Sequence, residues 1–190
     1  MFVPDESQIC NPIHLQALIQ ACENTGTRFV SNCSDLELQF TEKGARLSSV
    51  TFQGQTENVD QVFVCVGAWS TELLSDIGIE LPIVPVRGQM VLYKLDEQPF
   101  APILNEGARY IVPRVDGHVV VGSTTEEAGF DESTTDEEIA SLKEFANRLV
   151  PALTPERVLK TWAGLRPASC LLYTSPSPRD ATLSRMPSSA

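Results

Sequence analysis

The chain has few of the side chains from which proteins build a metal centre or a nucleophilic triad. It contains only two histidines, His14 and His118, and none of its five cysteines belongs to a Cys-x-x-Cys pair. A zinc site, a histidine-based metal site, a disulfide framework and a Ser/His/Asp triad therefore have little material. We expect no metal, and we expect any chemistry to come from a cofactor.

Positive charge and long apolar runs are also scarce. The chain has 14 basic residues against 25 acidic ones, whereas nucleic acids and anionic membranes bind proteins that present a positive face. No apolar run approaches the roughly 20 residues that span a bilayer, and the first residues lack the basic and apolar regions of a secretory signal. We therefore expect a soluble, cytoplasmic protein that handles small molecules and binds no nucleic acid.

The N-terminal part contains helix and strand signals in alternation. Asn11 and Pro12 mark the start of a helix that should end near Gly26. An antiparallel meander of three short strands is predicted next, at residues 27–30, 36–40 and 47–52. Residues 59–66 are almost continuously apolar and stop at Gly67, which predicts a strand buried on both faces. The end of such a strand is where open α/β sheets bind ligands.

From about residue 82 the signals are those of an antiparallel sheet. Strands are predicted at residues 84–95, 109–114 and 118–122, and Asp116-Gly117 is a strong hairpin signal. Thr135 and Glu138 form a predicted capping box before an amphipathic helix that ends ahead of Pro151. The last ordered piece covers residues 158–168. The fold class predicted for the whole chain is α/β, with an antiparallel sheet joined to part of a parallel one.

Two residues of the second part are candidates for binding a substrate. Tyr110 shares a strand face with Val112 and Arg114, although composition alone favours a tyrosine that simply packs there. Arg166 stands in an apolar Trp-Ala-Gly-Leu-Arg-Pro stretch, where a buried guanidinium needs an anionic partner. That partner is either a substrate carboxylate, which matches the guanidinium fork, or an acid of the chain itself.

Other conspicuous residues have simpler interpretations. Gly67 could make only a turn, with Trp69 filling the core, and Asp60 is most simply a turn residue. Glu126 and Glu127 are adjacent and would point in opposite directions on a strand, so we interpret both as solvated.

The composition changes abruptly at residue 170. Residues 173–190 are rich in Ser, Pro and Thr without periodicity, which is typical of a flexible tail. Residues 171–186 also resemble the translation of sequencing-adaptor DNA joined to a truncated read, and we prefer that interpretation. Residues 170–190 are therefore expected to be non-native and to contribute nothing to the fold.

Five motifs in a fixed order carry a family resemblance. They are Gly-Ala-Trp-Ser at 67–70, Pro-Val-Arg-Gly-Gln at 85–89, Tyr-Ile-Val-Pro-Arg at 110–114, Val-Gly-Ser-Thr at 121–124 and Trp-Ala-Gly-Leu-Arg-Pro at 162–167. Over about residues 8–169 the chain resembles the D-amino-acid oxidase family of FAD-dependent oxidoreductases, in particular its glycine oxidase branch. The ordered series is far more specific than any one motif.

The resemblance implies a cofactor, a domain organisation and a role for several residues. FAD is the implied cofactor, with residues 1–81 as a partial FAD-binding domain, 82–160 as an antiparallel-sheet substrate domain and 161–169 as a return segment. Arg166 matches the arginine that pairs with the substrate carboxylate, and Tyr110 matches a sheet tyrosine whose hydroxyl assists it. The cofactor side is matched by Cys65, Gly67 and Trp69 near the flavin and by Asp35 near the adenine.

The reaction implied is the oxidation of glycine, another small amine or a D-amino acid. A hydride leaves the α-carbon for the flavin, and water hydrolyses the resulting imine to a 2-oxo acid and ammonia. Positioning does most of the protein's work, and no side-chain base is required if the amine reacts neutral. Oxygen or another electron acceptor would reoxidise the flavin, and a homo-oligomer of the full-length protein stays open.

The chain departs from this family pattern at both ends. It lacks the strand, the Gly-x-Gly-x-x-Gly loop and the helix that hold the cofactor pyrophosphate. After Pro167 the tail replaces the Asp, Pro and Gly with which the family continues. A second hypothesis is therefore a non-catalytic, β-rich binding or interaction module that has lost its nucleotide domain.

We predict that the 190-residue chain binds FAD weakly or not at all, because it has no glycine loop to hold the pyrophosphate. Purified protein mixed with excess FAD and passed through a desalting column should be colourless. A stable yellow complex with near-stoichiometric flavin absorbance would contradict this prediction.

Overall fold

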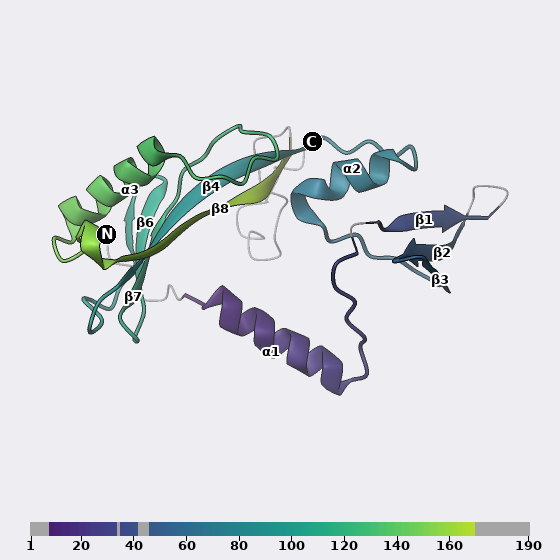
Figure 1. Ribbon diagram of the computed structural model, residues 1–190, viewed down its shortest axis with the longest axis horizontal. Helices are drawn as coiled ribbons and strands as arrows, with labels where there is room; N and C mark the ends of the chain where they lie inside the picture. Colours follow the sequence, from purple (N-terminus) through teal and green to yellow (C-terminus); the bar gives the residue numbers. More distant parts are fainter. Residues whose placement is uncertain (1–7, 34, 42–45, 170–190) are drawn as a thin grey trace, which may run out of the picture. The chain divides into compact units, whose positions relative to one another are not determined.

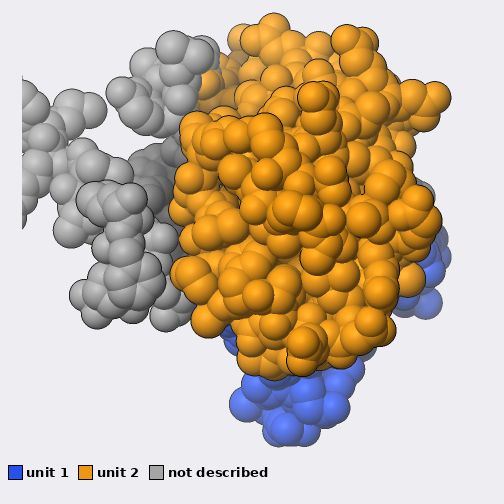
Figure 2. Space-filling view, turned by 90° about the vertical axis from the view of Figure 1, so that its left-hand side faces the viewer, with its two compact units in different colours: residues 1–63 blue, residues 64–190 orange. Residues whose placement is uncertain are grey.

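A computed structural model of the protein describes residues 8–33, 35–41 and 46–169. The expectation for residues 170–190 lies outside this part. The chain separates into two compact units, residues 1–63 and 64–190, which Figure 2 shows in blue and orange. None of the described helices is long and apolar enough to cross a membrane.

The first unit contains one helix and a three-stranded antiparallel sheet (Figure 1). The sheet order is β1-β2-β3, with bounds Glu37–Phe40, Leu47–Phe52 and Gln55–Asn58. Two of the three predicted strands are confirmed, but the one at residues 27–30 is wrong. Gln53 and Gly54 have φ of 49° and 71°, as in a two-residue hairpin turn, so the chain folds straight back and β3 pairs with β2 instead.

The predicted N-terminal helix is confirmed as α1 (Asn11–Asn24). It begins one residue earlier than expected, with Cys10 at the N-cap, and it ends before Gly26, whose φ is +90°. Its apolar positions are largely uncovered, since Leu15 is 58% exposed. The helical spacing is thus a correct guide to the secondary structure and no guide to burial here.

The strand predicted at residues 59–66 is wrong in this structure. These residues form no strand, and Phe63 is 83% exposed. A strand buried on both faces requires hydrogen-bonded neighbours, and neither sheet of the described part places a strand beside this segment. Gly67 instead opens the short helix η1 (Gly67–Trp69), which continues into α2 (Ser70–Ser75).

The second unit is built on a five-stranded antiparallel sheet of order β5-β6-β7-β4-β8. The bounds are Ile83–Lys94 for β4, Leu104–Glu106 for β5, Arg109–Pro113 for β6, His118–Gly122 for β7 and Val158–Ser169 for β8. The predicted antiparallel sheet and its hairpin at Asp116-Gly117 are confirmed, with Gly117 at φ +82°. Strands β4 and β8 pair from Ile83↔Ser169 to Tyr93↔Val158 and form the longest ladder.

Helix α3 (Asp136–Leu149) covers one face of this sheet (Figure 1). Its predicted apolar face is confirmed, since the helix buries Ile139, Leu142, Phe145 and Ala146 against the strands. The predicted capping box is wrong, because the hydroxyl of Thr135 accepts a hydrogen bond from Gln89 Nε2 at 3.0 Å rather than capping the helix. The side chain of Gln89 thus ties the start of α3 to strand β4.

Tyr93 lies in the core between the sheet and α3. Its side chain is fully buried, and its hydroxyl has no hydrogen-bond partner in the part of the chain that the structure describes. Burial raises the pKa of Tyr93 to about 12, because a phenolate is destabilised in apolar surroundings.

We predict that this tyrosine makes the protein sensitive to alkali. The folded-state pKa lies above the unfolded value of about 10, so the associated stability is complete below about pH 10 and is lost as the pH rises through 12. Urea unfolding followed by circular dichroism should show that the free energy of unfolding falls by about 2–3 kcal/mol as this tyrosine ionises above about pH 10.

Two variants separate this tyrosine from other groups that titrate in alkali. Tyr93→Phe keeps the ring and removes the ionisation, so its free energy of unfolding should change less with pH. Tyr110→Phe, on the other face of the sheet, should keep the steep dependence. Equal slopes for Tyr93→Phe and the unaltered protein would exclude Tyr93 as the source.

Candidate functional site

The face of the sheet opposite α3 carries the substrate-site candidates. Tyr110, Gly122, Met90 and Trp162 are paired in one row across β6, β7, β4 and β8. Residues paired across antiparallel strands project to the same side. The next row, Ile111, Val121 and Val91, is fully buried and belongs to the core under α3. The row of Tyr110 therefore faces away from that helix.

Three glycines leave positions without side chains on this open face. Gly88 and Gly164 are paired two residues along from Met90 and Trp162, and Gly122 lies in the row of Tyr110. A Cβ at Gly164 would meet no atom within 4 Å. At Gly88 and Gly122 the space is filled by side chains that reach across from neighbouring strands, and these side chains include the two candidates.

Arg166 crosses from β8 over β4 through the space above Gly88. A Cβ at Gly88 would lie 2.2 Å from Arg166 Nη2, so the absence of a side chain there is what lets the guanidinium lie across the strand. Beyond β4, Nη2 donates hydrogen bonds to Ser123 Oγ and to the carbonyl oxygen of Thr124, the latter at 3.2 Å. The guanidinium is thus held immediately after the end of β7.

Tyr110 approaches the same place from β6. Its Cζ atom would lie 3.1 Å from a Cβ at Gly122, and its hydroxyl lies 3.5 Å from Met90 Sδ. Since Ser123 follows Gly122 in the chain, Tyr110 and Arg166 approach consecutive residues at the end of β7. The structure therefore brings together the two substrate-binding candidates, which the sequence could only nominate separately.

The charge of Arg166 is not neutralised by an acid among residues 8–33, 35–41 and 46–169. Its hydrogen-bond partners are a hydroxyl and a carbonyl oxygen, whereas Arg87, Arg148 and Arg157 each pair with a carboxylate. Of the two interpretations open from the sequence, the internal salt bridge therefore finds no support here. A half-buried cation with neutral partners is suited to binding an anion.

Glu126 is a correction to the expectation that both adjacent glutamates are solvated. Its side chain is 21% exposed and accepts hydrogen bonds from Arg87, Gln89 and Thr124. Burial raises the pKa of Glu126, but these hydrogen bonds and the guanidinium of Arg87 outweigh it and lower the pKa overall. Glu127 is exposed, as expected.

The cofactor-side candidates of the second unit gather at the start of η1. Cys65 is an exposed free thiol, and Gly67 has φ +59° with no atom within 4 Å of a Cβ position. Trp69 is 41% exposed and contacts Phe130 at 5.9 Å between ring centroids, so it does not fill the core. A planar group could approach this open surface, whereas the chain contains no Gly-x-Gly-x-x-Gly loop for phosphates.

Asp35 belongs to the first unit. It is exposed, and its carboxylate accepts a hydrogen bond from the backbone N–H of Gln53 at 2.8 Å. This bond fixes the turn between β2 and β3.

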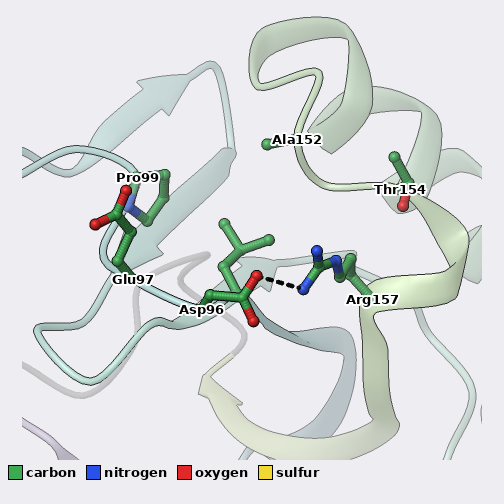
Figure 3. A pocket seen from close by; sticks show the side chains of 7 residues that line it. Asp96, Glu97, Pro99, Ala152, Thr154 and Arg157 are labelled. Atoms are coloured by element: carbon green, nitrogen blue, oxygen red, sulfur yellow. Dashed lines mark hydrogen bonds and ion pairs between the residues drawn. The ribbon is translucent and has the colours of Figure 1, made fainter.

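A hollow of about 700 Å³ lies at the opposite end of the β4–β8 ladder (Figure 3). Arg157 and Asp96 point toward each other there, with Nη1 and Oδ2 3.1 Å apart. Since β8 begins at Val158, Arg166 lies eight residues along the strand, which is roughly 26 Å. The hollow is thus separate from the candidate site, and its two facing charges neutralise each other.

Several residues that shape the site received no role from the sequence. Gly88, Ser123 and Thr124 lie within the recognised motifs, and Met90 follows one of them. Period-2 alternation does place Gly88 and Met90 on one strand face. The crossing of Arg166 over Gly88 depends on the pairing of β4 with β8, which no local pattern specifies.

Comparison with known proteins identifies the family. The model of the FAD dependent oxidoreductase family matches residues 1–182, so the chain belongs to this family of FAD-dependent enzymes. The glycine oxidase of Pseudomonas aeruginosa is 47% identical over 110 residues, which are 58% of this chain and 30% of that protein. The resemblance found in the five motifs and the FAD cofactor that it implies are therefore confirmed.

Solved structures agree with the fold. The glycine oxidase from Bacillus cereus has a TM-score of 0.62 at 29% identity, over 70% of this chain and 36% of its own. The iminodiacetate oxidase from Chelativorans sp. has a TM-score of 0.74 at 24% identity, over 84% and 43%, and supports the fold alone. The predicted mixed α/β class is thus confirmed. The chain spans about a third of the length of the curated relatives it matches.

We predict that Gly88→Ala displaces Arg166, because the added methyl group would lie 2.2 Å from Nη2. In ¹⁵N–¹H spectra of the arginine side chains, the Nε signal of Arg166, assigned through Arg166→Lys, should shift. Gly164→Ala is the matched control, since its methyl group meets open space on the neighbouring strand. The same Arg166 signal in Gly88→Ala as in the unaltered chain would show that the guanidinium does not lie over Gly88.

Proposed function

We propose that the full-length protein oxidises glycine, another small amine or a D-amino acid to the imine by hydride transfer to FAD. The observation that carries this proposal is the half-buried guanidinium of Arg166, whose partners among the described residues are a hydroxyl and a carbonyl oxygen. Tyr110 lies against Gly122, the residue before Ser123. A carboxylate is the anion that the guanidinium fork matches best among amino-acid groups.

Arg166 holds the substrate carboxylate. Ser123 and Thr124 engage Nη2, which leaves further N–H donors of the planar fork for the ligand. Fixing one nitrogen in advance reduces the side-chain entropy that the long arginine would lose on binding. The neighbouring Gly164 leaves open space on the same face for the substrate.

Tyr110 supplies a second hydrogen bond to the carboxylate. Its hydroxyl faces the thioether of Met90 at 3.5 Å, and a thioether is a weak acceptor. A carboxylate oxygen is a stronger acceptor, so the hydroxyl turns to the ligand at little cost. Together Arg166 and Tyr110 fix the carboxylate end and hence the direction of the α-carbon.

The cofactor side is assigned to the start of η1. Cys65, Gly67 and Trp69 would lie beside the flavin, and the main chain at Asp35 would contact the adenine. The open backbone at Gly67 and the exposed ring of Trp69 support this assignment. FAD bound there would supply the two-electron oxidation at the α-carbon, and oxygen or another electron acceptor would reoxidise it.

The chain's own residues bind and orient, and they move no proton. The amine loses its proton to solvent, and water hydrolyses the free imine to a 2-oxo acid and ammonia. A substrate whose amine is already neutral needs no side-chain base, which fits a site whose described partners are arginine, tyrosine, serine and threonine.

We predict that Arg166→Ala in the full-length flavoenzyme raises the KM for amino acids by roughly 10- to 100-fold, as expected for a charge-assisted bidentate pair. FAD content should hardly change. Arg166→Lys should be intermediate, because it keeps the charge and loses the fork. Steady-state kinetics and the flavin-to-protein absorbance ratio measure both quantities.

Arg157→Ala is the matched control, since Arg157 is exposed, pairs with Asp96 and lies far along the sheet. Its KM should equal that of the unaltered enzyme. Loss of flavin from Arg166→Ala with unchanged substrate kinetics would contradict the role proposed for this arginine.

A further inference from the structure

We propose that Glu126 is a positioning residue that aims Arg166 from the opposite side of the sheet, acting through Thr124. The inference deepens the proposed function and rests on it, because it takes Arg166 as the group that binds the substrate carboxylate. Glu126 itself contacts no substrate in this scheme. Its carboxylate lies with Arg87 and Gln89, on the α3 side of β4.

After β7 the chain stays in contact with β4. Instead of leaving the sheet at Gly122, residues 123–126 continue beside β4. The backbone N–H of Gln89 donates to Thr124 Oγ1 at 2.9 Å. Arg87 and Glu126 exchange two backbone hydrogen bonds, at 2.9 and 3.0 Å. The segment is therefore attached to β4 at two points, and the Thr124 side chain is one of them.

The carboxylate of Glu126 binds three side chains. It accepts hydrogen bonds from Arg87 Nη2 at 2.8 Å, from Gln89 Nε2 at 2.9 Å and from Thr124 Oγ1. Arg87 is 93% buried, so this is a largely desolvated, charge-assisted cluster. Thr124 Oγ1 thus donates a hydrogen bond to Glu126 and accepts one from the backbone N–H of Gln89, which fixes the side-chain rotamer of Thr124.

Thr124 also contacts Arg166 on the open face. While its hydroxyl is bound to Glu126, its carbonyl oxygen accepts the hydrogen bond from Arg166 Nη2 at 3.2 Å. Ser123, the residue before it, accepts the second hydrogen bond from the same nitrogen. Any rotation of this segment moves both acceptors together, so the direction of the guanidinium depends on the anchoring of Thr124.

The cluster also explains why Glu126 does not neutralise Arg166. Arg87 takes up the Glu126 carboxylate on one side of the sheet and pairs with Asp131 at 2.6 Å as well. The acid nearest in sequence to Thr124 is therefore already paired. Glu126 therefore positions Arg166 without forming an ion pair with it, and the charge of Arg166 stays available for a ligand.

The first experiment measures the order of Arg166 in the 190-residue chain, independently of substrate. Thr124→Val keeps the side-chain volume and removes the hydroxyl. Glu126→Gln replaces the carboxylate that accepts the hydrogen bond from this hydroxyl by a weaker acceptor. Both should lower the ¹⁵N–¹H heteronuclear NOE of Arg166 Nε. Thr124→Ser restores the hydroxyl and should restore the NOE, and Glu127→Gln, one residue along and exposed, should leave it unchanged.

An unchanged Arg166 NOE in a folded Thr124→Val protein would overturn the proposal. So would a lowered NOE in Thr124→Ser equal to that in Thr124→Val, because the hydroxyl would then be irrelevant. Circular dichroism establishes that each variant is folded. If Glu126→Gln does not fold, the pair of Thr124 variants alone decides the matter.

The second experiment measures kinetics in the full-length flavoenzyme with glycine as the substrate. Thr124→Val and Glu126→Gln should raise KM about tenfold, on the scale expected when a binding group is misaimed, with kcat changed less. Glu127→Gln should stay near the unaltered values, and Thr124→Ser should have a KM well below that of Thr124→Val, because it regains the hydroxyl. A purely structural role would lower the melting temperature and leave KM as it was.

The two experiments distinguish the failure of this inference from that of the proposed function. If the NOE falls while KM is unchanged, Glu126 does position Arg166, and the assignment of Arg166 to the substrate carboxylate is wrong. If the NOE is unchanged, the positioning role is overturned whatever KM does. A fall in the NOE together with a rise in KM supports both.

Discussion

The long antiparallel ladder between β4 and β8 is the constraint on which the rest of the second unit depends. Its register pairs Gly88 with Gly164 and Val86 with Arg166. The guanidinium of Arg166 therefore crosses β4 at Gly88, a position that has no side chain. A shift of one residue would turn Arg166 to the buried face and replace Gly88 by a larger residue. The alternation along β4 also sends Arg87 and Gln89 to the helix side, where they organise the polar cluster.

The sequence was sufficient for elements with a strong local signal. The hairpin at Asp116-Gly117, the apolar face of α3 and the long strand β4 all follow from turn chemistry and periodicity, and the structure has each of them. The predictions that failed depended on neighbours. Residues 59–66 have the composition of a buried strand, but composition cannot supply the flanking strands that such burial requires.

In the candidate site, too, single residues could be predicted from local patterns, whereas their arrangement could not. Tyr110 and Arg166 could be nominated from alternation and from a cation in apolar surroundings, yet their convergence depends on the sheet order, which places two strands between them. Glu126 was misjudged because adjacent acids in an acidic chain are usually solvated. Only the bridge between Arg87 and Glu126 brings that carboxylate to a buried guanidinium. Pairing between residues that are far apart in the sequence cannot be predicted from local patterns.

The segment at residues 123–126 serves both faces of the sheet at once. Its side chains complete a desolvated polar cluster, and its carbonyl and hydroxyl oxygens receive the arginine on the other face. Changes that retune the arginine end of the site would therefore also disturb the interior, which restricts how freely that end can diverge. At the tyrosine end, Met90 and Tyr110 fill the space above Gly122 and take no part in the polar cluster on the other face. Changes in side-chain size would accordingly be easier to accommodate there.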